Sequence, residues 1–316
     1  MNLLRILKQK LRNFYFKIVK AGYSEKDFDE YQKDYLYLPD CRDASLKEQF
    51  YSGNLEKINH PIIQYYKQLL RLIDEQVQGK KGFAIIRVSD GEAYFLQGRL
   101  VGNGPKRHFT SGQTLSLEYL NLFRQGLLKC DLRLIEMYKN NQQNFLKIYG
   151  RNIFSEIPFE CVYALIASRD VFRRPYKIGL IGSEKKLEII KQLLESKTYQ
   201  QYIGRDKFDH YIAVPEKGAS NDVLQLAKHI KAQLRGDIDV YLVGIGIAKL
   251  AVLPELKKSS HAVFIDAGAG LSALAGLVSH SRAYFADWTN FRLKNYDYSQ
   301  VDIMDADMKE EKIVLV

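Results

Sequence analysis

Apolar residues form two kinds of run along this chain. Five short runs are apolar almost throughout, which is typical of buried parallel strands rather than of strands with one solvated face. Between them lie longer stretches with apolar residues every three or four positions, which indicate helices. Strands that alternate with helices predict an α/β fold with a mostly parallel sheet covered by helices on both faces. The predicted strands are residues 83–88, 176–182, 211–215, 239–244 and 262–266.

The helical stretches are longest on either side of the first predicted strand. The apolar stripe is regular in residues 61–78, and residues 114–147 are again mostly helical in pattern. Ser220 directly precedes a later stretch, and its hydroxyl is a candidate for an amino-terminal cap. The predicted helices are residues 61–78, 114–147, 187–194, 221–234 and one that begins near residue 248.

The beginning of the chain has a pattern of its own. Leu3, Leu7, Leu11, Phe14 and Ile18 recur at helical spacing, and the six charged side chains of residues 1–20 are all basic. Such a helix can lie on anionic lipid, or it can dock on the core with its lysines in water, and the pattern fits both. The expected divisions are a helical and wrapping extension, 1–58, one main domain, 59–290, and a tail, 291–316.

Composition narrows the class of protein. With 316 residues, 46% hydrophobic and 27% charged, the chain is typical of a soluble globular protein. No segment reaches the roughly 18 uninterrupted apolar residues of a membrane span. Three widely spaced cysteines match no zinc or disulfide pattern, which favours a reducing cytoplasm. Beyond residue 20 the chain holds 41 basic and 37 acidic side chains, so the net charge of +10 does not indicate a nucleic-acid surface over the whole domain.

The end of the first predicted strand carries the clearest candidate chemistry. There the sequence reads Arg87-Val88-Ser89-Asp90-Gly91-Glu92, and open α/β sheets bind their ligands at the carboxyl ends of strands. In an extended segment Asp90 and Glu92 would point to the same side, and Gly91 would permit a tight turn between them. Two such carboxylates suit a hard divalent cation. The alternative is a surface turn in which Asp90 caps the next helix.

Later strand ends offer further polar groups. Two of them combine glycine with a lysine at a predicted helix start, where backbone amides favour anions, although neither is a complete phosphate-binding signature and each is also a plain tight turn. Asp266 ends the fifth strand, where it suits a sugar hydroxyl or proton abstraction, with helix capping as its structural alternative. The other candidates at these strand ends are Gly182, Ser183, Lys185, Gly244, Gly246 and Lys249.

Together these features resemble the GT-D type glycosyltransferases, over about residues 60–290, with R-x-x-D-G-E at 87–92 as the most specific element. The resemblance implies a single Rossmann-like domain that binds a UDP-sugar. It also implies that Asp90 and Glu92 hold Mn²⁺ or Mg²⁺ and the diphosphate, with Arg87 in support. Val88-Ser89 stand where family members often have an aromatic residue and a glycine. The expected nucleotide-sugar-binding residues are Arg87, Ser89, Gly91, Gly182, Ser183, Lys185, Gly244, Gly246 and Lys249, and the expected catalytic residues are Asp90, Glu92 and Asp266.

We therefore expect a cytoplasmic, metal-dependent glycosyltransferase that moves a sugar from a UDP-sugar to a glycan acceptor in bacterial surface-polysaccharide or glycoprotein synthesis. Residues 1–20 would bring it to a lipid-linked acceptor at the inner face of the membrane. Asp266, Glu184 and Glu216 are candidates for the base that takes the acceptor proton. Two alternatives stay open: a methyltransferase-like enzyme built on residues 243–246, and a non-catalytic membrane-associated scaffold. Sugar, acceptor and linkage are not specified by the sequence.

Overall fold

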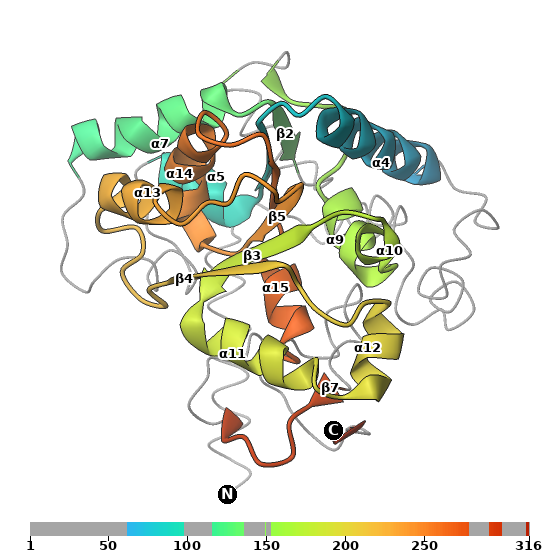
Figure 1. Ribbon diagram of the computed structural model, residues 1–316. Coiled ribbons are helices and arrows are strands. Elements are labelled where there is room, and N and C mark those ends of the chain that lie inside the picture. Colours follow the sequence, from blue (N-terminus) through green and yellow to red (C-terminus); the bar gives the residue numbers. More distant parts are fainter. Residues whose placement is uncertain are drawn as a thin grey trace, which may run out of the picture.

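The computed structural model describes residues 62–97, 116–135, 149, 153–277, 291–298 and 314–315. Within them the chain forms a six-stranded, all-parallel sheet with helices packed on it (Figure 1), which confirms the predicted α/β fold class. The predicted helix of residues 1–20 and the wrapping segment 21–58 lie outside the described residues.

The strands follow the order β2-β1-β6-β5-β3-β4 across the sheet. Five of the six coincide with the apolar runs that predicted strands, and all of these except the edge strand β4 are buried along most of their length. Strand β1 lies next to the edge strand β2 and pairs with β2 on one side and with β6 on the other. The strands are β1 (Phe83–Val88), β2 (Leu132–Ile135), β3 (Ile178–Ser183), β4 (His210–Val214), β5 (Val240–Val243) and β6 (Val263–Asp266).

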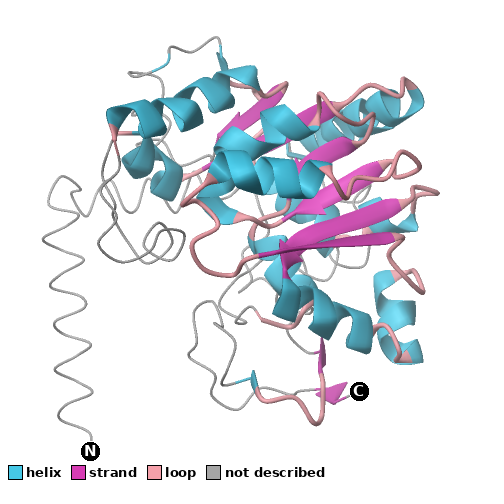
Figure 2. Cartoon of the chain, turned by 60° about the vertical axis from the view of Figure 1, so that its left-hand side comes forward, coloured by secondary structure: helices cyan, strands magenta, loops and turns pink. Residues whose placement is uncertain are grey.

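Helices cover both faces of the sheet (Figure 2). Successive residues of a strand point to opposite faces, so the strands contribute side chains to two separate apolar cores, one on each face. No helix in the described part of the chain is both long and apolar enough to cross a bilayer. One core is closed by α4 (Ile62–Gln78), α9 (Glu160–Ala167), α10 (Asp170–Arg173), α11 (Glu184–Leu193), α12 (Lys197–Ile203) and α15 (Ala269–Leu274). The other is closed by α5 (Asp90–Leu96), α7 (Leu117–Lys129), α13 (Val223–Lys231) and α14 (Lys249–Leu256).

Two local predictions are wrong. Within the stretch 114–147, predicted to be mostly helical, α7 ends before Cys130 and Leu132–Ile135 instead form the edge strand β2. Residues 136–147 lie outside the described residues. A run of only four residues is too short to show strand periodicity beside a strongly helical pattern. Ser220 does not cap the helix that follows it: Asp222 is the cap, and its carboxylate accepts a hydrogen bond from the Gln225 amide at 2.9 Å.

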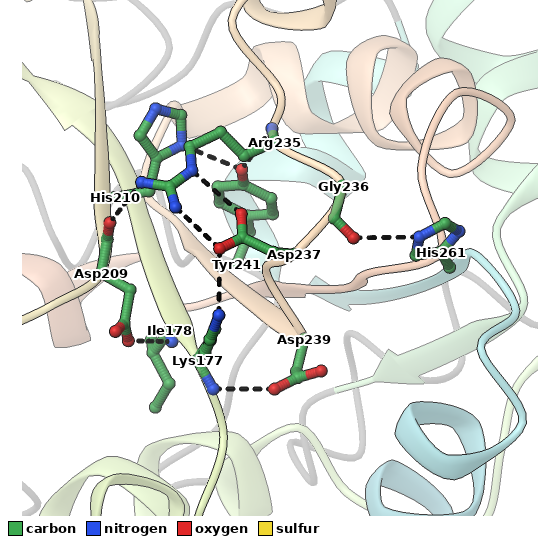
Figure 3. A network of polar contacts seen from close by, with 10 residues as sticks. All are labelled: Lys177, Ile178, Asp209, His210, Arg235, Gly236, Asp237, Asp239, Tyr241 and His261. Atoms are coloured by element: carbon green, nitrogen blue, oxygen red, sulfur yellow. Dashed lines mark hydrogen bonds and ion pairs between the residues drawn. The ribbon is translucent and has the colours of Figure 1, made fainter.

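Aspartates fasten the amino edge of the sheet at three places. Each aspartate lies directly before a strand, and its backbone amide donates to the carbonyl of a residue at the start of the neighbouring strand. Its carboxylate accepts a hydrogen bond from the backbone amide of that same neighbouring residue. Figure 3 shows two of them, Asp209 and Asp239. In each case the carboxylate lies 2.8 Å from the amide nitrogen: Asp131 with Ala84, Asp209 with Ile178, and Asp239 with Lys177.

The tail contributes a second, two-stranded parallel sheet. Its strands are β7 (Phe291–Arg292) and β8 (Val314–Leu315). The Phe291 ring packs edge-on against Tyr199 of α12, with ring centroids 5.2 Å apart. The first strand of the tail is therefore joined to the apolar core of the main domain.

Candidate functional site

Four charged side chains meet inside the protein at the carboxyl edge of the sheet. Arg87 lies near the end of β1, Glu92 in α5 after β1, Lys249 at the start of α14 after β5, and Asp266 at the end of β6. Their exposed fractions are 6, 8, 4 and 1%, respectively. The structure thus brings together four residues that the sequence placed at separate strand ends.

Lys249 is the centre of this charged network. Its Nζ lies 2.7 Å from Asp266 Oδ2 and 2.8 Å from Glu92 Oε1, so one ammonium joins two carboxylates. Gly246, with a φ of +57°, opens the short 3₁₀ turn Gly246–Ala248 that leads into α14. A positive φ is readily adopted by glycine, so this turn is what brings Lys249 to the strand ends.

Arg87 completes the network from the other side. Its Nη2 lies 3.2 Å from Asp266 Oδ1, and its Nε donates to the Asp266 carbonyl oxygen at 2.7 Å. The guanidinium also lies over the rings of Tyr163 and Phe159, at 4.3 and 5.4 Å from their centroids. Gly268 leaves space for it, because a Cβ there would be 1.8 Å from Arg87 Nη2. Sequence analysis missed these three neighbours; only Gly268, two positions after Asp266, gave a visible signal.

Electrostatics keep Arg87, Glu92 and Lys249 charged. Burial raises the pKa of Glu92, but the charge and hydrogen bond of Lys249 and the hydrogen bonds of Ser89 outweigh it and bring that pKa from 4.5 to about 2. Burial lowers the pKa of Lys249 and of Arg87, yet Asp266 and Glu92 raise both above their ordinary values. Two cations and two carboxylates make the network neutral overall, which limits the cost of taking the charges out of water.

From Asp90 onward the segment that ends at Glu92 is helical rather than extended. Helix α5 begins at Asp90, and the Ala93 amide donates to the Ser89 carbonyl at 2.9 Å. Positions 90 and 92 are therefore about 200° apart around a helix axis, so the extended backbone from which their same-side arrangement was predicted is not present there. The side chain of Asp90 lies outside the described residues. Gly91 is not needed for a tight turn, because a Cβ there would meet nothing within 4 Å.

Ser89, not Asp90, occupies the cap position of α5. Its amide and its hydroxyl both donate to Glu92 Oε2, at 3.0 and 2.7 Å. A Glu three residues after a cap serine that reaches back to the serine amide is half of a capping box. The sequence Ser89-Asp90-Gly91-Glu92 carries that signature, and Glu92 accordingly serves both the helix start and Lys249.

The expected phosphate-binding glycines face a side chain. A Cβ at Gly182 would lie 2.2 Å from Leu271 Cδ2, and one at Gly244 would lie 2.9 Å from the same atom. Small residues at these strand ends thus make room for Leu271 of α15. The Ser183 hydroxyl beside them is buried and has no partner among the described residues. Lys185, in the first turn of α11, is exposed and outside the charged network.

A preformed metal site does not fit the described carboxylates. Both oxygens of Glu92 and both of Asp266 already accept bonds from the protein. No group of three His, Cys, Asp or Glu side chains in the described part of the chain is arranged to hold a metal ion. Glu92 is an ionised oxygen donor of the kind that Mn²⁺ and Mg²⁺ prefer, but it is committed to Lys249 and Ser89.

Comparison with known proteins leaves the fold as the established result. The chain matches no protein-family model, no curated protein and no solved structure. Its all-parallel sheet with helices packed on it is consistent with a Rossmann-like α/β fold. The family resemblance of residues 87–92 therefore remains a hypothesis about function.

Proposed function

We propose that this protein is a glycosyltransferase that moves a sugar from a UDP-sugar to a glycan acceptor. The observation that carries the proposal is the buried charged network of Arg87, Glu92, Lys249 and Asp266 at the carboxyl ends of β1 and β6. The R-x-x-D-G-E sequence supplies two of its members.

The location of the network, and the desolvation cost of burying its charges, support an enzymatic role. Ligands of open α/β sheets bind outside the carboxyl ends of the strands. Buried ion networks are weak stabilisers, because desolvation offsets most of the attraction. Groups whose pKa values are shifted by specific partners are concentrated at functional sites. The pKa values of Arg87 and Lys249 are raised, and that of Glu92 is lowered, by their partners in the network.

The residues of the network suit transfer from a nucleotide diphosphate. The leaving diphosphate gains negative charge, and a preorganised ammonium or guanidinium stabilises that charge. Lys249 and Arg87 can do so when phosphate oxygens replace their carboxylate partners. The exchange would free Asp266 from Lys249, and its carboxylate could then take the proton of an acceptor hydroxyl. Ligand binding and activation of the base would thus be one event.

Metal dependence is a separate part of the proposal. The D-x-E resemblance makes Asp90 and Glu92 the ligands of Mn²⁺ or Mg²⁺, which would act as a Lewis acid on the diphosphate. Because the described carboxylates are already committed, the steps above use the cations of the protein alone. The lipid-linked acceptor and the anionic membrane surface that we propose as partners depend on residues 1–20, outside the described part of the chain.

Thermal unfolding with candidate ligands tests the class of enzyme. UDP should raise the unfolding temperature of the protein, and the rise is compared with and without Mn²⁺. S-adenosylmethionine should not raise it, because only a ligand that binds the folded state stabilises that state. Stabilisation by S-adenosylmethionine instead of UDP would favour the methyltransferase alternative. Lipid binding with no nucleotide effect would favour the scaffold.

Turnover of UDP-sugars by variants tests the site. Glu92→Gln and Asp90→Asn should each lower hydrolysis or transfer by about 100-fold or more, as loss of an electrostatic catalytic group does. Glu195→Gln, on an exposed glutamate after α11, is the matched control and should keep full activity. Circular dichroism confirms that each variant is folded. The proposal is wrong if folded Glu92→Gln and Asp90→Asn both turn over UDP-sugars at the wild-type rate.

A further inference from the structure

A second concave site lies at the opposite, amino edge of the sheet. It is a pocket of about 430 Å³ between the loops that precede β1, β5 and β6. Residues 80–82, 234–236 and 257–261 line it. Because the charged network lies at the carboxyl edge, this pocket is distinct from the proposed active site.

The lining of the pocket is strongly basic. Five of its residues are lysine or arginine, a sixth is His261, and none is acidic. Two serines, Ser259 and Ser260, supply hydroxyl groups, and Leu234 is the single large apolar residue of the lining. The basic residues are Lys80, Lys81, Arg235, Lys257, Lys258 and His261.

Carboxylates outside the lining balance only part of this charge. Lys257 Nζ lies 2.6 Å from Asp131 Oδ1, and Lys258 Nζ lies 2.6 Å from Glu255 Oε1. Among the described residues, no carboxylate pairs with Lys80 or Lys81. These two lysines leave a positive surplus on the β1 side of the pocket.

Arg235, which lines the pocket, belongs to a network of polar contacts with neighbouring residues (Figure 3). The Arg235 guanidinium donates two hydrogen bonds to the Asp237 carboxylate, from Nε to Oδ1 at 3.0 Å and from Nη2 to Oδ2 at 2.7 Å. Asp237 also accepts from Lys177 at 3.1 Å, so one carboxylate is shared by two cations and neutralises neither fully. Across the pocket, His261 Nε2 donates to the Gly236 carbonyl oxygen at 3.0 Å.

Close backbone packing holds the other side in place. A Cβ at Gly82 would lie 2.0 Å from the Lys257 carbonyl oxygen and 2.2 Å from that of Ser260. Only glycine allows the loop before β1 to approach the loop before β6 so closely. Lys80 and Lys81 are therefore presented by a segment whose position is fixed by the adjoining loop.

We propose that this pocket binds a small, multiply charged, phosphate-bearing anion. Its volume lies within the roughly 300–1,000 Å³ of small-molecule sites. Lysine ammonium groups and serine hydroxyls are suited to phosphate oxygens, with which charge-assisted hydrogen bonds are the strong ones. The described residues of the lining include no Phe, Tyr or Trp on which a nucleobase could stack, so recognition rests on the phosphates of the ligand.

Calorimetric titration of the full chain with inorganic tripolyphosphate tests the proposal. EDTA in the buffer removes divalent metal from the proposed donor site. The variant Lys80→Gln/Lys81→Gln deletes the two unpaired charges without shortening either side chain much. Lys197→Gln/Lys207→Gln deletes two exposed lysines at α12 and the turn before β4, and is the matched control.

The wild type and the control are expected to bind tripolyphosphate. Lys80→Gln/Lys81→Gln is expected to bind it at least about tenfold more weakly, because each substitution removes one attractive interaction between a lysine and the anion. Wild-type affinity should also fall as NaCl is raised, because salt screens exposed charges. No binding by the wild type, or equal weakening in both double variants, would overturn the proposal.

Discussion

Glu92 joins two parts of the molecule through one carboxylate. One oxygen accepts from the Ser89 amide and hydroxyl at the start of α5, and the other faces Lys249 at the start of α14. A buried carboxylate with this many donors is ionised at neutral pH, and the pKa of Glu92 is lowered to about 2. The same bonds that make Glu92 a structural residue also make its release from Lys249 a costly step for any ligand.

The acid sensitivity of the protein should depend on Glu92. Its pKa is about 2 in the folded state against an ordinary 4.5, so its stabilisation is complete above pH 4.5 and is lost as pH falls toward 2. This difference corresponds to about 3 kcal/mol at pH 7. Urea unfolding at pH 7, 4 and 3 should show wild type more stable than Glu92→Gln at pH 7, with the gap shrinking as pH falls. A gap that stays constant across this range would contradict the assignment, and Glu195→Gln should show no gap.

At the scale of elements, apolar strands and regular helices could be predicted from the sequence, and the charged network could not. Strand β3 is buried at every position, so its sequence is apolar throughout. Strand β2 was missed because only Leu134 and Ile135 of its four residues are buried. A strand that is buried at every position can thus be predicted from its apolar run, whereas the four-residue edge strand β2 could not.

The contacts within the candidate site could not be predicted by considering each strand end separately. Arg87, Lys249 and Asp266 were each identified as polar groups beside a ligand, yet the structure pairs them with one another. Such pairing depends on which strands are neighbours, and no local pattern states that β6 lies beside β1. Likewise, Gly182 and Gly244 were assigned to phosphate because Leu271, which fills the space, lies far along the chain.

The aspartates at the amino edge should contribute measurably to stability. Asp209→Ala removes the carboxylate that accepts the Ile178 amide at 2.8 Å, and this part-buried donor would lose its partner. The expected loss is about 1–3 kcal/mol in the free energy of unfolding, measured by urea titration. Asp206→Ala, on an exposed neighbour in the same loop, is the control and should cost much less. Equal losses in the two variants would show that the Asp209 bond adds nothing.

At the scale of the whole molecule, the sheet consists of two halves. Strands β1 and β2 form one half, joined by Asp131, and β3 to β6 form the other, in which Asp209 and Asp239 bind β4 and β5 to β3. The halves meet where β1 pairs with β6. Arg87–Asp266 and Glu92–Lys249 are both ion pairs across this seam.

The seam has a consequence for the order of folding. Pairing β1 with β6 closes a loop of 179 residues between Arg87 and Asp266, and contacts between distant parts of a chain form late because loop closure costs entropy. In pulsed hydrogen exchange during refolding, the Ile178 amide, bonded to Asp209, should gain protection before the Arg87 amide, bonded to Asp266. Simultaneous protection would mean that the sheet assembles as one unit. If the order holds, the proposed active site is complete only when the last strand pair has formed.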